Sequence, residues 1–307
     1  MTTQTMQEII PQLQEQLSLY GKVTVNVLNP DLAEGCAGKK VYIEGKTYIY
    51  RSLKSWMDLA ELLHCKMHLP KEGPHPLVEI TMEILESKKS FHLDKTENKE
   101  EKYGVTSSFF EIQKMEEPAF LYYYLEALNN VQTEKRKRIL NLGVNRGDEF
   151  SVIKKQLDIN KYQNMEFVGI DHSKTAIEYA QGRFEEGNVH FYAEDINTLE
   201  SLDLGKFDLL ISIGTLQSPS INFKPFFMNL VQNYLEEDAA VILGFPNSRW
   251  KEGEMIYGAK APNYAMSEMS LLFNDVIFCK KYLQQKKYRV TITGKHYIFL
   301  TATRIGR

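Results

Sequence analysis

The sequence has little cysteine and no long apolar run. Its 307 residues include three cysteines, Cys36, Cys65 and Cys279, which lie far apart and form no CxxC pair. Neither a disulfide framework nor a thiolate zinc site is therefore expected. No apolar stretch reaches the roughly 18 to 20 residues that cross a bilayer, and the first residues lack the basic and then apolar pattern of a secretory signal. These absences predict a cytoplasmic protein with no membrane partner.

An excess of charge of one sign and an internal repeat are also missing. The 37 basic residues face 40 acidic ones, which gives a formal net charge of −3. Such a balance disfavours a surface that follows nucleic-acid phosphates, although a local basic patch remains compatible with it. The absence of a fixed period excludes solenoids and propellers. With 43% hydrophobic and 25% charged residues, the composition is that of a folded chain, and the length predicts about two domains.

A highly charged stretch separates two kinds of pattern. Residues 87–103 are mostly charged and contain few apolar side chains, which indicates a linker or an exposed loop. We therefore predict an N-terminal domain at residues 1–104, a connecting helical segment at 105–133 and a second domain at 134–307. The first part shows helical spacing at residues 6–17, alternation at 23–27, a hairpin around Gly45, and a short helix from Trp56 that Pro70 ends. This order of elements predicts a small α+β domain.

Short apolar strands alternate with helical stretches in the second part. Pro118 opens a helix, and the strand candidates are residues 139–142, 167–170, 189–192, 207–213 and 239–245, followed by a hairpin at 288–293 and 296–303. Nearly continuous apolar runs of this length are typical of parallel strands that are buried on both faces. The sequence thus predicts an α/β fold with a doubly wound, mostly parallel seven-stranded sheet that ends in an antiparallel hairpin, plus the smaller α+β domain.

Glycines and carboxylates follow the first three of these strands. The chain reads Asn141-Leu-Gly143-Val-Asn145-Arg-Gly147 after the first, Asp171 ends the second, and Asp195 follows the third. Ligands of open α/β sheets bind beyond the carboxyl ends of the strands, where these carboxylates can accept hydrogen bonds from ribose hydroxyls and an adenine amino group. An ordinary turn without a ligand stays an alternative for each feature alone. Their joint placement favours an adenosine site.

The loop does not suit a dinucleotide. A GxGxxG motif requires glycines at positions 143, 145 and 148, and the chain has Gly143, Asn145 and Asp148. Asp148 and Glu149 are expected to place negative charge in the first turn of the following helix, which would repel a pyrophosphate. S-adenosylmethionine carries a sulfonium and an ammonium and no phosphate, so it fits this loop better.

From about residue 134 to the end, these motifs and their order resemble the class I S-adenosylmethionine-dependent methyltransferases. The resemblance implies a Rossmann-like fold, S-adenosyl-L-methionine as cofactor, and a glycine loop under its methionine part. It further implies that Asp171 holds the ribose, His172 lies along the adenine, Asp195 and Ile196 meet the adenine edge, and Ile213 ends the strand beside the reacting centre. In the family an acidic residue usually stands where Asn141 is, and a glycine where Asn145 is. The implied cofactor residues are Asn141, Gly143, Asn145, Gly147, Asp171, His172, Asp195, Ile196 and Ile213.

The methyl acceptor is the least determined feature. Methyl transfer from a sulfonium needs an aligned nucleophile and often no dedicated base, so no catalytic residue is predicted. The fourth strand lacks the carboxylate of metal-dependent relatives and the Asn/Asp-Pro-Pro-aromatic motif of DNA amino-methylating relatives, and we expect no metal. Candidate acceptor-pocket residues are Gln217, Trp250, Tyr257 and Tyr264, for which simple packing is an equal alternative.

Three further groups favour structural roles. His64 and His68 lie four residues apart without a third ligand, so a helix end is favoured over a metal site. The basic run at residues 135–138 is more typical of a solvated helix end than of a phosphate contact, and packing is favoured for the tyrosines at 122–124.

The leading hypothesis is a metal-independent methyltransferase acting on a small molecule, with the N-terminal domain and residues 109–130 covering the acceptor pocket. Two alternatives stay open. One is methylation of RNA or protein, and the other is a non-catalytic module that binds the cofactor or acts through partners.

Overall fold

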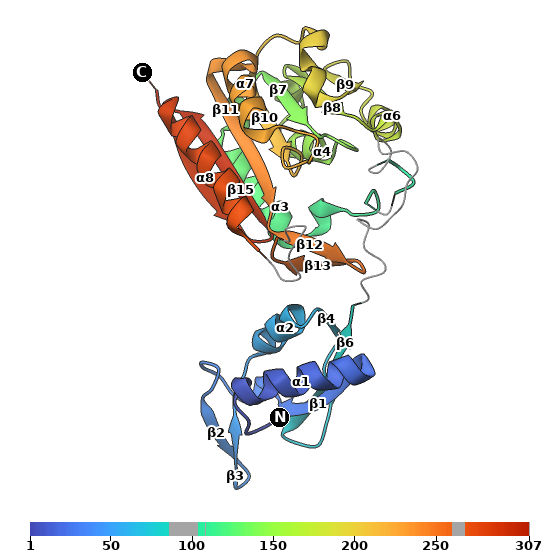
Figure 1. The fold of residues 1–307 in the computed structure, drawn as a ribbon, viewed down its shortest axis with the longest axis vertical. Helices are drawn as coiled ribbons and strands as arrows, with labels where there is room; N and C mark the ends of the chain where they lie inside the picture. Colours follow the sequence, from blue (N-terminus) through green and yellow to red (C-terminus); the bar gives the residue numbers. More distant parts are fainter. Residues whose placement is uncertain (86–103, 108, 260–267, 307) are drawn as a thin grey trace. The chain divides into compact units, whose positions relative to one another are not determined.

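The chain divides into two compact units. The computed structural model describes residues 1–85, 104–107, 109–259 and 268–306 (Figure 1). One unit comprises Met1–Ser90 together with Trp250–Tyr257, and the other comprises Phe91–Arg249 together with Gly258–Arg307. The linker expected at residues 87–103 lies outside the described residues, and the predicted domain boundaries stay predictions.

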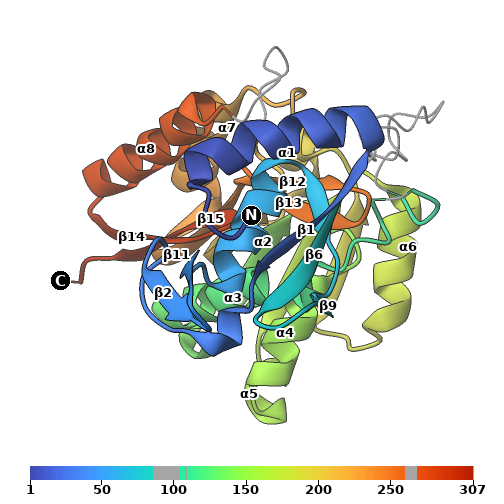
Figure 2. The ribbon, with the colours of Figure 1, turned by 90° about the horizontal axis from the view of Figure 1, so that it is seen from below.

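The first unit is a small α+β structure. An antiparallel sheet has the order β1-β6-β4, with β5 also paired to β6, and β2 and β3 form a separate hairpin. Helix α1 packs across β1 and β6 (Figure 2), where Ile9, Leu13 and Leu17 meet the alternating valines of β1. The elements are α1 (Met6–Tyr20), β1 (Lys22–Leu28), η1 (Pro30–Leu32), β2 (Lys40–Ile43), β3 (Lys46–Ile49), α2 (Leu53–Leu62), β4 (Cys65–Met67), β5 (Lys71–Glu72) and β6 (Leu77–Ile84).

The prediction that a helix continues to Pro70 is wrong. Helix α2 ends at Leu62, and His64 adopts a left-handed backbone conformation with φ 56°, after which β4 begins. His64 and His68 consequently flank a strand, and the His68 ring nitrogen Nε2 lies 2.9 Å from Glu83 Oε2. Within the described ranges, no group of three His, Cys, Asp or Glu side chains is arranged to hold a metal ion.

The second unit contains a seven-stranded sheet with the order β14-β15-β11-β10-β7-β8-β9. The pairings from β11 through β10, β7 and β8 to β9 are parallel, whereas β15 runs antiparallel to both β11 and β14. Its strands are β7 (Arg138–Leu142), β8 (Glu166–Asp171), β9 (Val189–Ala193), β10 (Phe207–Ile213), β11 (Leu235–Pro246), β14 (Tyr288–Gly294) and β15 (Tyr297–Arg304). The hairpin of β12 (Ser248–Lys251) and β13 (Glu254–Tyr257) follows β11 in the chain, and most of it belongs to the first unit. The predicted fold class is confirmed.

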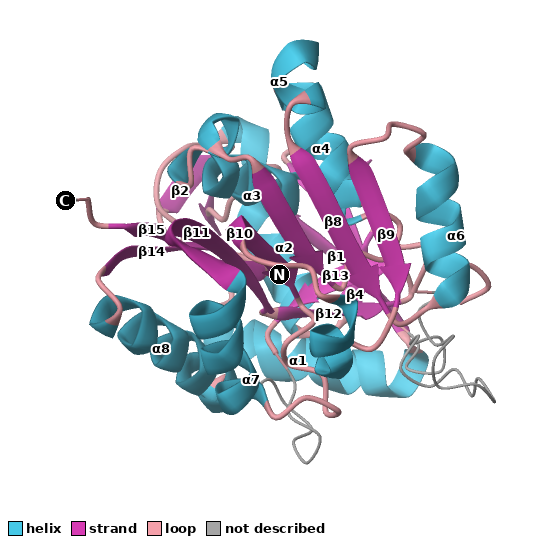
Figure 3. Cartoon of the chain, turned by 90° about the horizontal axis from the view of Figure 1, so that it is seen from above, coloured by secondary structure: helices cyan, strands magenta, loops and turns pink. Residues whose placement is uncertain are grey.

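Helices cover both faces of this sheet (Figure 3). On one face, Phe227 of α7 and Tyr282 of α8 belong to a core that includes Leu140 and Ile170 of the strands. On the other face, aromatic pairs join α3 to β15 and α4 to β8. The helical elements are η5 (Lys114–Glu116), α3 (Pro118–Asn130), η6 (Thr133–Lys135), α4 (Asp148–Gln156), α5 (Ile159–Gln163), α6 (Lys174–Arg183), η7 (Ile196–Leu202), α7 (Phe223–Asn229), η8 (Leu230–Tyr234) and α8 (Ser270–Gln285). Among the described residues, no helix has the length and apolarity needed to span a membrane.

Basic residues before β7 bind the amino ends of the strands. Arg138 donates through Nε to Glu166 Oε2 at 2.6 Å and through Nη1 to the Lys206 carbonyl at 2.6 Å. Arg136 donates to the carbonyls of Val131 and Asp238. Lys135 Nζ donates to Gln132 Oε1 at 3.1 Å, so three of the four basic side chains at residues 135–138 are engaged within the protein. Arg136 and Arg138 make their contacts at the end of the sheet opposite to the glycine loop.

Candidate functional site

The glycine loop at residues 143–147 joins β7 to α4 and is tied to the end of β8. The N–H groups of Gly143 and Val144 donate to the Ile170 carbonyl at 2.8 and 3.1 Å. Gly143, Asn145 and Gly147 have φ values of 76°, 45° and 79°. A β-carbon built on Gly143 would lie 1.8 Å from Thr215 Oγ1, so this position requires glycine both for its backbone and for space.

Asp171 connects the loop to β8 through its carboxylate. Its Oδ2 accepts from the N–H of Asn145 and its Oδ1 from the N–H of Ser173, both at 3.0 Å. The residue is only 6% exposed, and this burial raises the pKa of Asp171 against the opposing effect of the N–H donors. His172 Nδ1 lies 3.5 Å from Asp171 Oδ1. The loop and Asp171 are thus one hydrogen-bonded unit.

The end of β9 lies beside this unit. The Glu194 N–H donates to the Asp171 carbonyl at 3.0 Å. The Asp195 carboxylate, on an exposed residue, accepts from the backbone N–H and the side-chain amide of Asn197, both at 2.9 Å. Asp195 therefore caps its own turn, which is the ordinary role named above as the alternative to a ligand contact. The neighbouring Ile196 is buried.

Unpartnered amide atoms mark the carboxyl ends of three adjacent strands. Asn141 Nδ2 at the end of β7, Gln217 Oε1 after β10 and Asn247 Oδ1 after β11 are buried, and none has a hydrogen-bond partner in the described part of the chain. Asn247 Nδ2 donates to the Lys295 carbonyl at 3.0 Å, which leaves its oxygen as the free acceptor. Ile213, the last residue of β10, is buried beside Gly244. The sequence reasoning missed Asn247, although its position directly after β11 was the available signal.

The two carboxylates at the start of α4 have different surroundings. Asp148 pairs with Arg146 Nε at 2.9 Å and with Arg183 Nη1 at 2.7 Å. Asp148 and Glu149 lie in the first turn of α4 as expected, and two arginines pair with the charge of Asp148. Glu149 is buried, at 8% exposure, and the Asn141 amide is close enough to stabilise its ionised form. Burial raises the pKa of Glu149 to about 7, with Asp148 adding to the rise while Lys114 and Asn141 oppose it.

Lys114 brings a positive charge to the same place. Its Nζ lies 5.3 Å from the centre of the Phe109 ring and 5.7 Å from that of Tyr297. Burial alone would lower the pKa of Lys114, but Tyr297, Glu149, Asp148 and Asp171 together raise it above the ordinary value. No sequence motif pointed to this lysine.

The segment that carries Lys114 is attached to the glycine loop and to α6. Arg146 Nη1 donates to the Phe110 carbonyl at 2.9 Å. The Phe110 ring meets the Tyr179 ring edge-on at 5.0 Å. These contacts hold residues 109–117 against the carboxyl edge of the sheet.

The other predicted acceptor residues lie in the insertion after β11. Trp250 and Tyr257 belong to the first unit, where the Tyr257 N–H donates to Glu61 Oε1 at 2.6 Å. Gln217 belongs to the second unit. Tyr264 lies outside the described residues.

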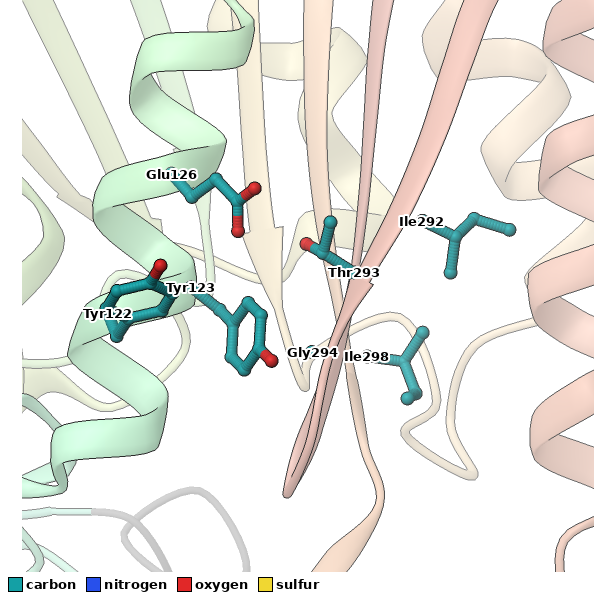
Figure 4. A pocket seen from close by; sticks show the side chains of 7 residues that line it. All are labelled: Tyr122, Tyr123, Glu126, Ile292, Thr293, Gly294 and Ile298. Carbon is teal, nitrogen blue, oxygen red and sulfur yellow. The ribbon is translucent and has the colours of Figure 1, made fainter.

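A separate hollow of about 540 Å³ lies between α3 and the terminal hairpin (Figure 4). Tyr123 and Glu126 point from α3 toward Thr293 of β14. Of the tyrosines at 122–124, Tyr124 is buried as expected, but Tyr122 and Tyr123 line this hollow instead of packing in the core. The hollow lies at the β14–β15 edge, separated from β7 by β11 and β10.

Comparison with known proteins identifies the family. A family model described as a methyltransferase domain matches residues 133–292, slightly more than half of the chain. The chain belongs to this methyltransferase family. The predictions of a class I S-adenosylmethionine-dependent methyltransferase and of its cofactor are confirmed.

Similar solved structures include three methyltransferases. The plantazolicin methyltransferase BpumL, in complex with a monoazolic desmethylPZN analog and SAH, is 15% identical, with 61% of this chain and 84% of that chain covered and a TM-score of 0.45. Coclaurine N-methyltransferase bound to N-methylheliamine and SAH is 18% identical, with coverage of 40% and 35% and a TM-score of 0.34. Precorrin-6y C5,15-methyltransferase from Geobacter metallireducens GS-15 is 11% identical, with coverage of 60% and 88% and a TM-score of 0.41. No curated protein matches the sequence significantly.

The residues at the carboxyl edge of this methyltransferase fit its cofactor. S-adenosylmethionine presents hydroxyl and amino donors, a sulfonium, and an α-amino acid end. The edge offers the Asp171 carboxylate, the buried Glu149 carboxylate and the amide of Asn141 with its unpartnered nitrogen. Acceptors and an anion are the groups that such a ligand requires.

Substitution of Gly143 by alanine should destabilise the methyltransferase. The left-handed φ and the contact with Thr215 together predict a loss of about 2 to 4 kcal/mol in the free energy of unfolding, measured by urea denaturation. Gly182→Ala is the matched control, because Gly182 is exposed in α6 with open space around it. That change should be neutral or stabilise by up to about 1 kcal/mol. Equal effects of the two substitutions would contradict the packing described for the loop.

The raised pKa of Glu149 predicts a pH-dependent stability. Its folded-state pKa of about 7 lies above the ordinary 4.5, so the folded protein binds this proton more tightly than the unfolded chain does. The contribution of Glu149 to the free energy of unfolding must then fall as the pH rises from about 4.5 to about 7. Relative to Glu149→Gln, the wild type should lose about 3 kcal/mol across this window in urea denaturation. The control Glu185→Gln, on an exposed loop, keeps Glu149 and should follow the wild type. If the wild type instead followed Glu149→Gln at every pH, the raised pKa of Glu149 would be contradicted.

Proposed function

We propose that the protein transfers a methyl group from S-adenosylmethionine to a small molecule that donates N–H or O–H groups. The observation that carries this proposal is the pair of buried, unpartnered acceptor oxygens, Gln217 Oε1 and Asn247 Oδ1, beyond the adjacent strands β10 and β11. A buried acceptor without a partner costs about 1 to 3 kcal/mol, and a donor group on a bound molecule would recover that cost.

The cofactor is assigned to the neighbouring strand ends. Asp171 would accept hydrogen bonds from the ribose hydroxyls, because each carboxylate oxygen can accept more than the one backbone N–H that it already binds. His172 and Ile196 would border the adenine, with Asp195 at its edge. Asn141, Gly143, Asn145 and Gly147 would form the floor beneath the methionine part, and Ile213 would adjoin the reacting centre.

The chain's own contribution to the reaction is positioning. The bound cofactor supplies an electrophilic methyl group, and the acceptor atom must be held about 3 to 3.5 Å from it and in line with the sulfur. Gln217 and Asn247 would orient the acceptor through their oxygens, and the apolar Ile213 would exclude water. This assignment needs no proton to move before the methyl transfer, so it names no catalytic base.

The placement of basic charge supports a small acceptor over a nucleic acid. The guanidinium groups of Arg136 and Arg138 donate hydrogen bonds to carbonyls and to Glu166 near the amino ends of the strands. They are therefore not available to bind phosphates at the carboxyl edge, where the site lies.

Transfer of a labelled methyl group tests the proposal directly. The protein is incubated with S-adenosylmethionine bearing a deuterated methyl group, together with a cell extract separated into small-molecule, RNA and protein fractions. Mass spectrometry should find the label in a small molecule. Label confined to RNA or protein would favour the macromolecular alternative, and absence of label from every fraction would favour the non-catalytic one; either result rejects the proposal.

Removal of the Asp171 carboxylate should weaken cofactor binding. Asp171→Ala loses two ribose contacts and the anchor of the glycine loop, so the affinity for S-adenosylhomocysteine should fall by about 1 to 3 kcal/mol in calorimetry. Asp203→Ala, at the exposed end of η7, is the control that should leave affinity unchanged. Unchanged affinity in Asp171→Ala would remove Asp171 from the site.

Replacement of Gln217 by methionine separates acceptor binding from folding. The substitution keeps the volume and removes a buried oxygen that has no partner in the described chain, so thermal stability should stay equal or rise. The KM for the acceptor should rise about tenfold while the affinity for S-adenosylhomocysteine stays unchanged. A KM equal to that of the wild type would show that Gln217 does not contact the acceptor.

A further inference from the structure

Two groups of opposite charge lie near the glycine loop. Glu149 lies in the first turn of α4, and Lys114 lies in the single turn η5 that precedes α3. Each is near enough to influence the ionisation of the other. Within the described residues, however, Lys114 Nζ has no carboxylate oxygen within ion-pair distance. The two groups therefore influence one another without a direct ion pair.

The Glu149 carboxyl has no direct ion-pair partner among the described residues. Arg146 and Arg183 neutralise the adjacent Asp148, and no arginine contact of this kind reaches Glu149 in the described chain. Tyr124 supports the turn by donating from its hydroxyl to the Glu149 carbonyl at 3.3 Å. The amide of Asn141 approaches the carboxylate, yet its Nδ2 meets full hydrogen-bond geometry with no described group. The Glu149 carboxyl and the Asn141 amide nitrogen therefore lie close together.

The positive side is held by aromatic rings. The Lys114 ammonium lies over the faces of Phe109 and Tyr297, which attract a cation without accepting a conventional hydrogen bond from it. The ring of Tyr297 in turn lies close to Gly214, at the carboxyl end of β10. The ammonium thus keeps its N–H donors available at the edge where the cofactor is assigned.

A half-buried ammonium and a buried carboxyl in one region are complementary to an α-amino acid zwitterion. We propose that Glu149 and Lys114 together bind the amino acid end of S-adenosylmethionine, with Glu149 accepting from its ammonium and Lys114 donating to its carboxylate. This inference rests on the proposed cofactor site and deepens it. It places the negative charge for the ammonium on α4, whereas the strand position, Asn141, carries only a neutral amide.

The arrangement also accounts for the cost of placing a half-buried Lys114 and a buried Glu149 near one another without a direct ion pair. An isolated buried ion is unfavourable, and a buried pair is stabilising only when hydrogen bonds satisfy both members. A zwitterion inserted between them would supply a charge-assisted hydrogen bond to each. One ligand would then satisfy both charges. Each of the two side chains should therefore be required for tight binding of that ligand.

Calorimetry with three ligands tests this assignment without measuring activity. S-adenosylhomocysteine carries the complete zwitterion, decarboxylated S-adenosylmethionine lacks the carboxylate, and 5′-methylthioadenosine lacks the whole amino acid end. Lys114→Met should weaken S-adenosylhomocysteine about tenfold or more and leave the other two unchanged. Glu149→Gln should weaken both ligands that carry an ammonium and leave 5′-methylthioadenosine unchanged. Lys174→Met and Glu185→Gln, at exposed positions, are matched controls that should change none of them.

The contrary results can be told apart. An equal loss of affinity for all three ligands would mean that the variants disturb the site as a whole, and Lys114→Arg, which keeps the charge, would then have to restore S-adenosylhomocysteine binding for the proposal to stand. Tighter binding of S-adenosylhomocysteine by Lys114→Met would show that the lysine competes with the cofactor. A wild-type protein that binds none of the three ligands would overturn the cofactor site itself, and that outcome is distinct from a failure of the Lys114–Glu149 assignment.

Discussion

The site depends on one carboxylate that joins two segments of chain. Asp171 accepts from the backbone of Asn145 and from that of Ser173, so a single side chain fixes the glycine loop and the start of α6 at the end of β8. Because the residue is buried, these hydrogen bonds are poorly screened by water, and their geometry is well defined. The hydrogen bond to Asn145 holds the middle of the loop, shortly before the first turn of α4 with Glu149.

Much of the second unit could be predicted from the sequence because its signals are local. Apolar runs located β7 to β11, Pro118 located the start of α3, and the glycines located the loop. Residues that end parallel strands are brought together by the topology of the sheet, so Asp171 and the glycine loop were found as neighbours without coordinates. The extension of β11 to residues 235–246 exceeded the prediction, since its polar first residues break the apolar pattern.

The electrostatics of the site could not be predicted in the same way. Lys114 lies about thirty positions before the glycine loop and in no motif, and its proximity to Glu149 follows from how residues 109–117 pack on α6 and Arg146. The neutralisation of Asp148 needs Arg183, which comes from the end of α6. The end of α2 was missed because the left-handed backbone of His64 has no distinctive residue to announce it. These features arise from contacts distant in sequence, which periodicity does not encode.

The first unit is built from two separate stretches of the chain. Because the segment Trp250–Tyr257 belongs with Met1–Ser90, the polypeptide passes from one unit to the other three times. A fragment that begins after the charged stretch would retain this hairpin but lack α2, whose Glu61 accepts a hydrogen bond from the hairpin. The N-terminal fragment alone would lack a piece of its own fold. The two units are therefore covalently interleaved, and a single proteolytic cut between them would not yield two complete domains.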